Sequence, residues 1–102
     1  MSEGARPPAA SITTLRILDV LLNNFAHGLT NGEVAKAAGI SPSQAVHHVA
    51  ALEAAGFAER VPETGRIRPS VRIAQKSTQI FRSLADAQQR IGEISNRIQQ
   101  GA

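Results

Sequence analysis

The chain has 102 residues, no cysteine, three phenylalanines as its only aromatic residues, and a formal net charge of +3. This length suits one small domain with an appendage, and the lack of cysteine excludes a disulfide framework and a thiolate metal site. The mild positive charge favours an anionic partner, while the few aromatic rings disfavour stacking on single-stranded nucleic acid. Because neither a membrane-length apolar run nor a signal peptide is present, we expect a cytoplasmic protein without membrane contact.

Residues 1–10 are predicted to form a flexible tail, because Gly4, Pro7 and Pro8 oppose helix formation. Ser11 is a candidate N-cap for a first helix, which we expect to end at His27-Gly28. The apolar residues of this helix follow the i, i+3, i+4 rule and predict one core-facing stripe. They are Ile12, Leu15, Leu18, Leu22 and Phe25, with Ile17 and Leu21 widening the stripe.

Residues 30–56 have the pattern of two short helices joined by a tight turn, which is a helix-turn-helix. Thr30 and Glu33 have the spacing of a capping box at the start of the first helix. Ser41 and Gln44 repeat this spacing at the start of the second. For the second helix, the apolar positions predict a buried stripe of Val46, Val49 and Leu52.

The second helix would expose short polar side chains that can reach base edges in the major groove. The expected outer face comprises Ser43, Gln44, His47, His48 and Ala51. The side chains expected to read bases are Ser43, Gln44 and His47. Those expected to fix the register on phosphates are Thr30, Ser41 and His48. The alternative interpretation is a helical hairpin that only packs within a small domain.

Residues 57–61 and 66–68 predict two short strands around a Pro62-Glu63-Thr64-Gly65 turn, with Ile67 facing inward. A hairpin directly after a helix-turn-helix is typical of a wing. The arginines expected to lie along the DNA backbone or in the minor groove are Arg60, Arg66 and Arg68. The alternative is a solvated hairpin edge that carries arginine to prevent strand pairing.

Residues 15–68 resemble the N-terminal winged helix-turn-helix domain of the IclR-type transcriptional regulators. The matching residues are Leu15-Arg16-Ile17-Leu18-Asp19, Leu29-Thr30, Val34-Ala35, Gly39-Ile40, Val46-His47, Leu52-Glu53-Ala54-Ala55-Gly56-Phe57 and Thr64-Gly65-Arg66. The resemblance implies sequence-specific binding of double-stranded DNA as a dimer. Family members continue into a long effector-binding domain, which this sequence replaces with a different segment, so we expect no small-molecule effector. In overall layout the chain is similar to short regulators of bacteriophages related to Mu.

Residues 70–100 predict one long helix, with Ser70 as its N-cap. Apolar or small residues recur in alternating steps of four and three, which is the heptad seam of a coiled coil. They are Ile73, Ser77, Ile80, Leu84, Ala87, Ile91, Ile94 and Ile98. From Ile80 onward we expect this seam to join two copies of the chain, and the alternative packs its first part onto the N-terminal domain. The basic residues beside the seam have few acidic partners, which leaves the orientation of the helices open.

The histidines lack the cysteine or carboxylate neighbours of a metal or catalytic site, and adjacent His47 and His48 point about 100° apart on a helix. We therefore expect no enzyme activity, no metal and no cofactor. The sequence predicts a mainly α fold with a small β-hairpin wing, divided into a tail (1–10), a winged helix-turn-helix domain (11–69) and a dimerisation helix (70–100). The predicted function is a sequence-specific regulator of transcription, a repressor, acting as a homodimer. The alternatives are a phage DNA-packaging or architectural subunit of higher oligomeric state and a winged helix that binds only proteins.

Overall fold

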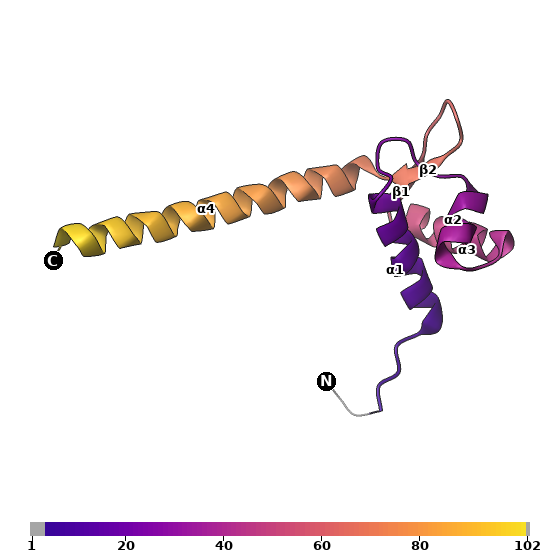
Figure 1. Ribbon diagram of the computed structural model, residues 1–102, viewed down its shortest axis with the longest axis horizontal. Helices are drawn as coiled ribbons and strands as arrows, with labels where there is room; N and C mark the ends of the chain where they lie inside the picture. Colours follow the sequence, from indigo (N-terminus) through magenta and orange to yellow (C-terminus); the bar gives the residue numbers. More distant parts are fainter. Residues whose placement is uncertain (1–3, 102) are drawn as a thin grey trace. The chain divides into compact units, whose positions relative to one another are not determined.

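A computed structural model describes residues 4–101 and divides them into two compact units, the first ending at Arg72 and the second beginning at Ile73. The elements, in chain order, are α1 (Ala9–Leu22), α2 (Asn31–Ala38), α3 (Pro42–Ala54), β1 (Ala58–Arg60), β2 (Ile67–Pro69) and α4 (Val71–Gly101) (Figure 1). Three helices and a two-stranded hairpin form the first unit, which is a winged helix-turn-helix. The predicted fold class, mainly α with a hairpin wing and a long C-terminal helix, is confirmed.

Helix α1 begins at Ala9 and ends at Leu22, so both of its predicted ends are wrong. Ser11 lies inside the helix, and the N-cap is Pro8, which offers no side-chain hydrogen bond. The predicted buried stripe is also displaced, because Ile17 and Leu21 are fully buried whereas Leu15 is 63% exposed. Apolar residues cover more than half of the circumference of α1, so periodicity alone does not choose the face. The face that carries Ile17 and Leu21 is the buried one because it packs against α2 and α3.

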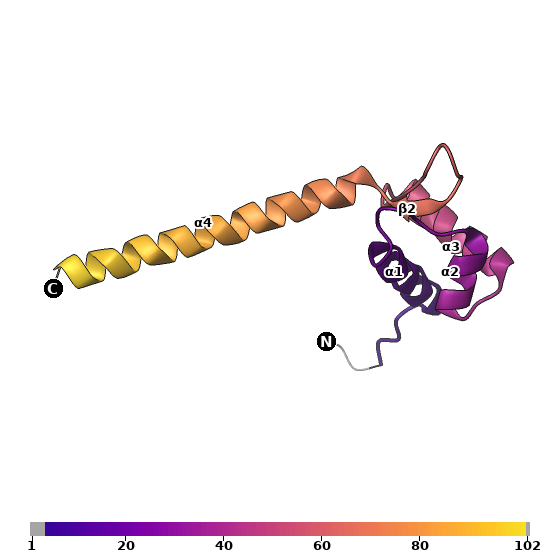
Figure 2. The same cartoon turned by 45° about the horizontal axis from the view of Figure 1, so that its top comes forward.

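Helices α2 and α3 begin with the two predicted capping boxes. Thr30 Oγ1 accepts the Glu33 N–H at 3.1 Å, and the Thr30 N–H donates to Glu33 Oε1 at 2.9 Å. Ser41 and Gln44 form the same reciprocal pair at 3.2 and 3.1 Å. Gly39 ends α2 with a φ of +70°, a left-handed conformation that glycine adopts without a Cβ clash. These local signals fix the turn between the two helices (Figure 2).

The buried face of α3 differs from the predicted one by a single residue. Ala45 and Val49 are fully buried and Leu52 is 3% exposed, whereas Val46 is 44% exposed. Three-residue steps each fall about 60° short of a full helical turn, so a stripe of Val46, Val49 and Leu52 would spread over about 120°. The observed step of four followed by three keeps the buried residues within about 60°, which is the width that the core accommodates.

The hairpin is antiparallel, with Ala58 opposite Pro69. Strand β1 is shorter than predicted, whereas β2 has the predicted length but lies one residue further along the chain. A third segment adds to it, because Leu29 and Ile67 exchange two main-chain hydrogen bonds, each 2.7 Å long. Ile67 is fully buried, as predicted. Gly28 has a φ of +74°, and a Cβ built on it would lie 2.6 Å from the Ile67 carbonyl oxygen. The approach of the Leu29 segment to the hairpin therefore requires glycine at position 28.

The start of α4 is held by hydrogen bonds that the sequence did not predict. Ser70 Oγ donates to the Gly56 carbonyl at 2.7 Å instead of accepting from the first turn of α4, so its predicted capping role is wrong. The Val71 N–H donates instead to Glu59 Oε1 at 3.0 Å. A carboxylate from β1 thus takes the place of the predicted serine cap. None of the helices in residues 4–101 combines the length and the apolar character needed to cross a membrane.

Candidate nucleic-acid interface

The outer face of α3 is defined by the core residues on its other side. Four exposed residues follow the spacing i, i+3, i+4, i+7 and share this face: Ser43, Val46, His47 and Ala50. Ser43 and His47 were predicted to lie here, but Val46 and Ala50 were not. The helical spacing from Ser43 is the signal that could have found both. This face carries one hydroxyl, one imidazole and two aliphatic side chains, and none of these groups repels phosphate.

Gln44 and Ser41 are exposed, but both already form hydrogen bonds at the start of α3. Gln44 Oε1 accepts the Ser41 N–H, and Ser41 Oγ lies 3.2 Å from Ser43 Oγ. A bidentate contact from Gln44 to adenine needs both its amide oxygen and its amide nitrogen. Gln44 must therefore release its capping hydrogen bond in order to read a base in that way. Thr30 differs from Gln44, because its Oγ1 accepts the Glu33 N–H at the start of α2 and the hydroxyl can still donate its own proton to a phosphate.

His48 lies between α1 and α3 and not on the outer face where it was expected. It is half-buried, and its Nδ1 is 2.8 Å from Thr14 Oγ1 in α1. Thr14 Oγ1 also lies 3.0 Å from the Ala10 carbonyl oxygen. The hydroxyl has one proton for these two acceptors, so when it donates to Ala10 the imidazole donates from Nδ1. A contact between His48 and a DNA phosphate stays a prediction.

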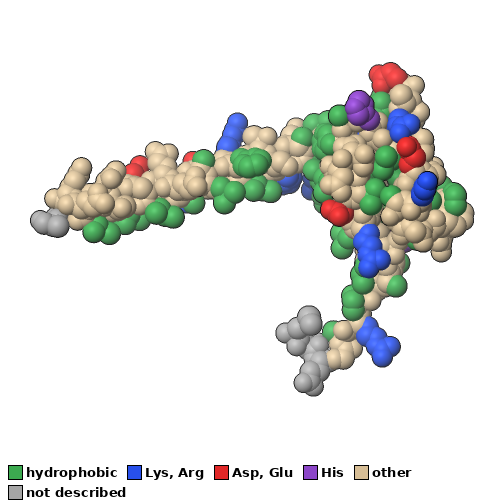
Figure 3. Space-filling model, viewed as in Figure 1, with side chains coloured by type: hydrophobic (Ala, Val, Ile, Leu, Met, Phe, Trp, Pro, Cys, Tyr) green, Lys and Arg blue, Asp and Glu red, His purple; other side chains and the backbone are tan. Residues whose placement is uncertain are grey.

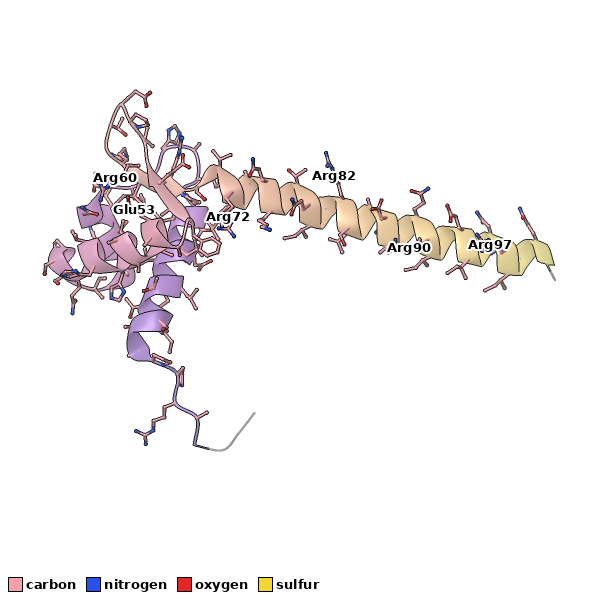
Figure 4. All side chains as sticks on the ribbon, turned by 180° about the vertical axis from the view of Figure 1, so that it is seen from behind. Glu53, Arg60, Arg72, Arg82, Arg90 and Arg97 are labelled. Atoms are coloured by element: carbon pink, nitrogen blue, oxygen red, sulfur yellow. The ribbon has the colours of Figure 1, made fainter. Side chains whose placement is uncertain are left out.

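Each of the three wing arginines forms an ion pair within its own domain. The distances are 3.6 Å for Arg60–Glu53, 2.6 Å for Arg66–Glu33 and 2.9 Å for Arg68–Glu59. Figure 4 labels the first of these pairs, and Figure 3 shows acidic and basic side chains interspersed on one face of the domain. The positive charges of the three wing arginines are therefore balanced by carboxylates of the same domain, and the sequence did not predict these pairs.

Two of these carboxylates also hold a main-chain N–H at the start of a helix. The N–H of Thr30, and then the Arg66 guanidinium, hold the pKa of Glu33 below its ordinary value. The N–H of Val71, followed by Arg68, lowers the pKa of Glu59. Both groups are more acidic than a free glutamate, because hydrogen bonds and positive charge favour the ionised form. Each therefore fixes a helix start and an arginine at the same time.

Helix α4 carries a continuous row of exposed apolar side chains along one side (Figure 3). The predicted dimerisation residues Ile80, Leu84, Ile91, Ile94 and Ile98 are exposed by 54% to 68%, and Ala87 is half-buried. Phe81, which stands beside the seam, is 72% exposed. Soluble proteins rarely leave such a row uncovered, so it indicates an interaction surface. Self-association through this row stays a prediction.

The exposed face of α3, the two capped helices and the anchored hairpin define a winged helix-turn-helix DNA-binding domain. Residues 13–62 match the sequence model of the IclR helix-turn-helix domain, so this segment is an IclR-type domain, as the resemblance predicted. Comparisons with curated proteins and with solved structures give no match. The domain supports a DNA-binding transcription regulator whose partner is double-stranded DNA. Within residues 4–101, no group of three or more acidic or histidine side chains is placed to hold a metal ion.

Proposed function

We propose that the protein is a sequence-specific transcriptional repressor that binds its operator as a homodimer in the cytoplasm. The observation that carries this proposal is the exposed face of α3 within an IclR-type domain. Ser43 and His47 supply hydrogen-bonding groups, and Val46 and Ala50 supply methyl groups. These are the groups that read base edges in the major groove. Their placement in the first two-thirds of α3 is the usual one for a recognition helix.

The proposed contacts divide into base reading and positioning. Ser43, Gln44 and His47 read base edges, with Gln44 exchanging its capping hydrogen bond for an adenine. Phosphate contacts from Thr30, Ser41 and His48 fix the register. The wing arginines, Arg60, Arg66 and Arg68, hold the backbone or the minor groove by exchanging a carboxylate for a phosphate. Two copies joined through α4 would read an inverted or direct repeat, and an occupied operator would block transcription.

The alternative function is a DNA-packaging or architectural subunit that assembles into more than two copies. A specific feature of α4 favours it. In a heptad numbering with Leu84 and Ile91 at a, isoleucines occupy the d positions 80 and 94. Isoleucine at d shifts parallel coiled coils toward three or four strands, whereas isoleucine at a, as at position 91, suits two. The seam therefore combines residues that favour two strands with residues that favour more. A measurement of the oligomeric state distinguishes the two functions.

The test combines light scattering with gel shifts on DNA fragments from around the protein's own promoter. A repressor is expected to be a dimer that shifts one discrete fragment in competition with unrelated DNA. A larger assembly that shifts every fragment alike would replace this proposal with the architectural function. Absence of any salt-dependent DNA binding would instead indicate a winged helix that binds only proteins.

A further inference from the structure

The seam of α4 has two unlike flanks. With Leu84 and Ile91 at a and Ile80 and Ile94 at d, the residues on the g flank are Lys76, Ser83, Arg90 and Arg97. Those on the e flank are Ala74, Phe81, Gln88 and Ser95. All eight side chains are exposed in α4. Thus one flank carries three positive charges and the other carries none.

The orientation of two paired helices decides which flanks meet. In a parallel pair the two-fold axis runs along the helices, so the g flank of one copy faces the e flank of the other. In an antiparallel pair the axis is perpendicular to the helices, so g faces g and e faces e. The unlike flanks of α4 therefore give the two orientations different energies.

An antiparallel pair would bring like charges together. With the apolar layers in full overlap, Lys76 of each copy would lie beside Arg97 of the other. A shift by one heptad would instead set Arg90 beside Arg90. Asp86 and Glu93 precede Arg90 and Arg97 by four residues on the same helix, but no ion pair joins them in the described part of α4. They reduce the repulsion and give no attraction across the pair.

A parallel pair avoids this repulsion and covers the exposed aromatic ring. Lys76 at g lies next to the e position five residues later on the other copy, which is Phe81. The aliphatic stem of lysine can cover the ring, and its ammonium group is attracted to the ring face. Phe81 is 72% exposed in the isolated helix, and this contact gives it a partner. Arg90 then lies beside Ser95 and meets no charge.

We infer that two copies of the chain pair through α4 in parallel and in register, with Lys76 of each copy on Phe81 of the other. This inference rests on the proposed homodimer. It sets the starts of both α4 helices at the same end of the coiled coil, where two attached DNA-binding domains can share one operator. In an antiparallel pair of this 31-residue helix the two starts would be about 45 Å apart.

Disulfide trapping tests the orientation directly, because the chain of 102 residues has no cysteine and an introduced cysteine is its only thiol. Ser77→Cys and Ile94→Cys each place a thiol in the seam, and the first replaces one atom in a small side chain. In a parallel pair in register, each variant alone should form a covalent dimer under mild oxidation. In an antiparallel pair with full overlap, position 77 faces position 94, so only a mixture of the two variants should cross-link. The matched control is Gln89→Cys on the outer side of α4, which should stay uncross-linked.

Strong cross-linking of both single variants and none of Gln89→Cys would support the parallel pair. Cross-linking that appears only in the mixture overturns it, and so does a light-scattering dimer in which neither the single variants nor the mixture cross-links. A monomer that still shifts one DNA fragment would overturn the homodimer on which the inference rests, while leaving DNA recognition by the winged domain intact. Gel shifts of the reduced Ser77→Cys protein confirm that the substitution preserves the fold.

Discussion

Arg66 in the wing donates to Glu33 Oε1 at 2.6 Å, and the same oxygen accepts the Thr30 N–H at the start of α2. One carboxylate thus joins the cap of a helix to the hairpin. A DNA phosphate would be a second acceptor for the same guanidinium. Contact between the wing and DNA is therefore an exchange of acceptors and not the docking of a free charge.

This exchange of acceptors predicts that substitutions at Glu33 and at Arg66 have opposite effects on DNA binding. Glu33→Gln keeps an amide oxygen for the Thr30 N–H but removes the charge that competes with phosphate. We expect tighter binding to all DNA sequences and a steeper dependence of log K on log salt. Arg66→Ala should weaken binding to all sequences similarly and flatten the slope by about 1. Asp19→Asn in α1 is the control for net charge, and equal slopes for Arg66→Ala and wild type would remove Arg66 from the DNA interface.

The lowered pKa of Glu59 predicts acid-sensitive stability. A carboxyl group whose pKa is lower in the folded than in the unfolded state contributes stability above its unfolded pKa, which is about 4.3. This contribution is lost as the pH falls through the folded value. We expect the urea midpoint of the wild-type chain to fall between about pH 5 and the lower pKa of the folded carboxyl, and to fall less in Glu59→Gln. Glu63→Gln in the hairpin turn is the control, and identical pH profiles of the wild type and Glu59→Gln would refute the prediction.

The hydrogen bond between Thr14 in α1 and His48 in α3 is predicted to stabilise the folded protein. His48→Ala and Thr14→Val should each lower the free energy of unfolding by about 0.5–1.5 kcal/mol. The double variant should lose less than the sum of the two, because both remove one bond. Chemical denaturation measures this coupling. Fully additive losses would mean that the bond contributes nothing to the free energy of unfolding.

The exposed Val46 predicts recognition of a thymine methyl group. Once an operator is selected from random DNA, replacing each thymine by deoxyuridine removes one methyl group at a time. We expect at least one replacement to weaken wild-type binding by several-fold, and to have no effect on Val46→Ala binding. Ala50→Gly gives the same test for the neighbouring side chain on this face. Equal sensitivity of wild type and Val46→Ala at every thymine would exclude a methyl contact from Val46.

Gln44 should affect specificity more than general affinity. Gln44→Ala is expected to cost about 1–3 kcal/mol at the cognate operator and to relax the preference at one base pair. Because this change also removes half of a capping box, Gln44→Glu is the control that keeps an oxygen for the Ser41 N–H. Uniform weakening of Gln44→Ala on all sequences would assign Gln44 to the cap alone.

The parts of the fold that the sequence predicted are those with local causes. Thr30 and Glu33 are three residues apart, and so are Ser41 and Gln44, and each pair forms the predicted box. Gly39 ends α2 at the predicted residue. Such signals act within one turn of helix, so neighbouring residues decide them without reference to the rest of the chain.

The parts that the sequence missed depend on distant residues. The choice between Ala45 and Val46 as the buried residue is made by the packing of α1 and α2, because both side chains are small and apolar. Glu33 and Arg66 are 33 residues apart, and only the fold reveals that they pair. The outer face of α3 was consequently predicted with Ser43 and His47 correct but without Val46.

The contact at Gly28 has a consequence for mutational tolerance. Gly39 has open space around the position of a Cβ, so its replacement by asparagine, which tolerates the left-handed region, should be accepted at a small cost. At Gly28 the same replacement meets the Ile67 carbonyl oxygen, a main-chain atom that cannot move without breaking the bridge to Leu29. A library that varies both positions and selects for folded protein should therefore recover several residue types at 39 and glycine alone at 28. The attachment of the wing to the three-helix core thus depends on a position that has room for glycine alone.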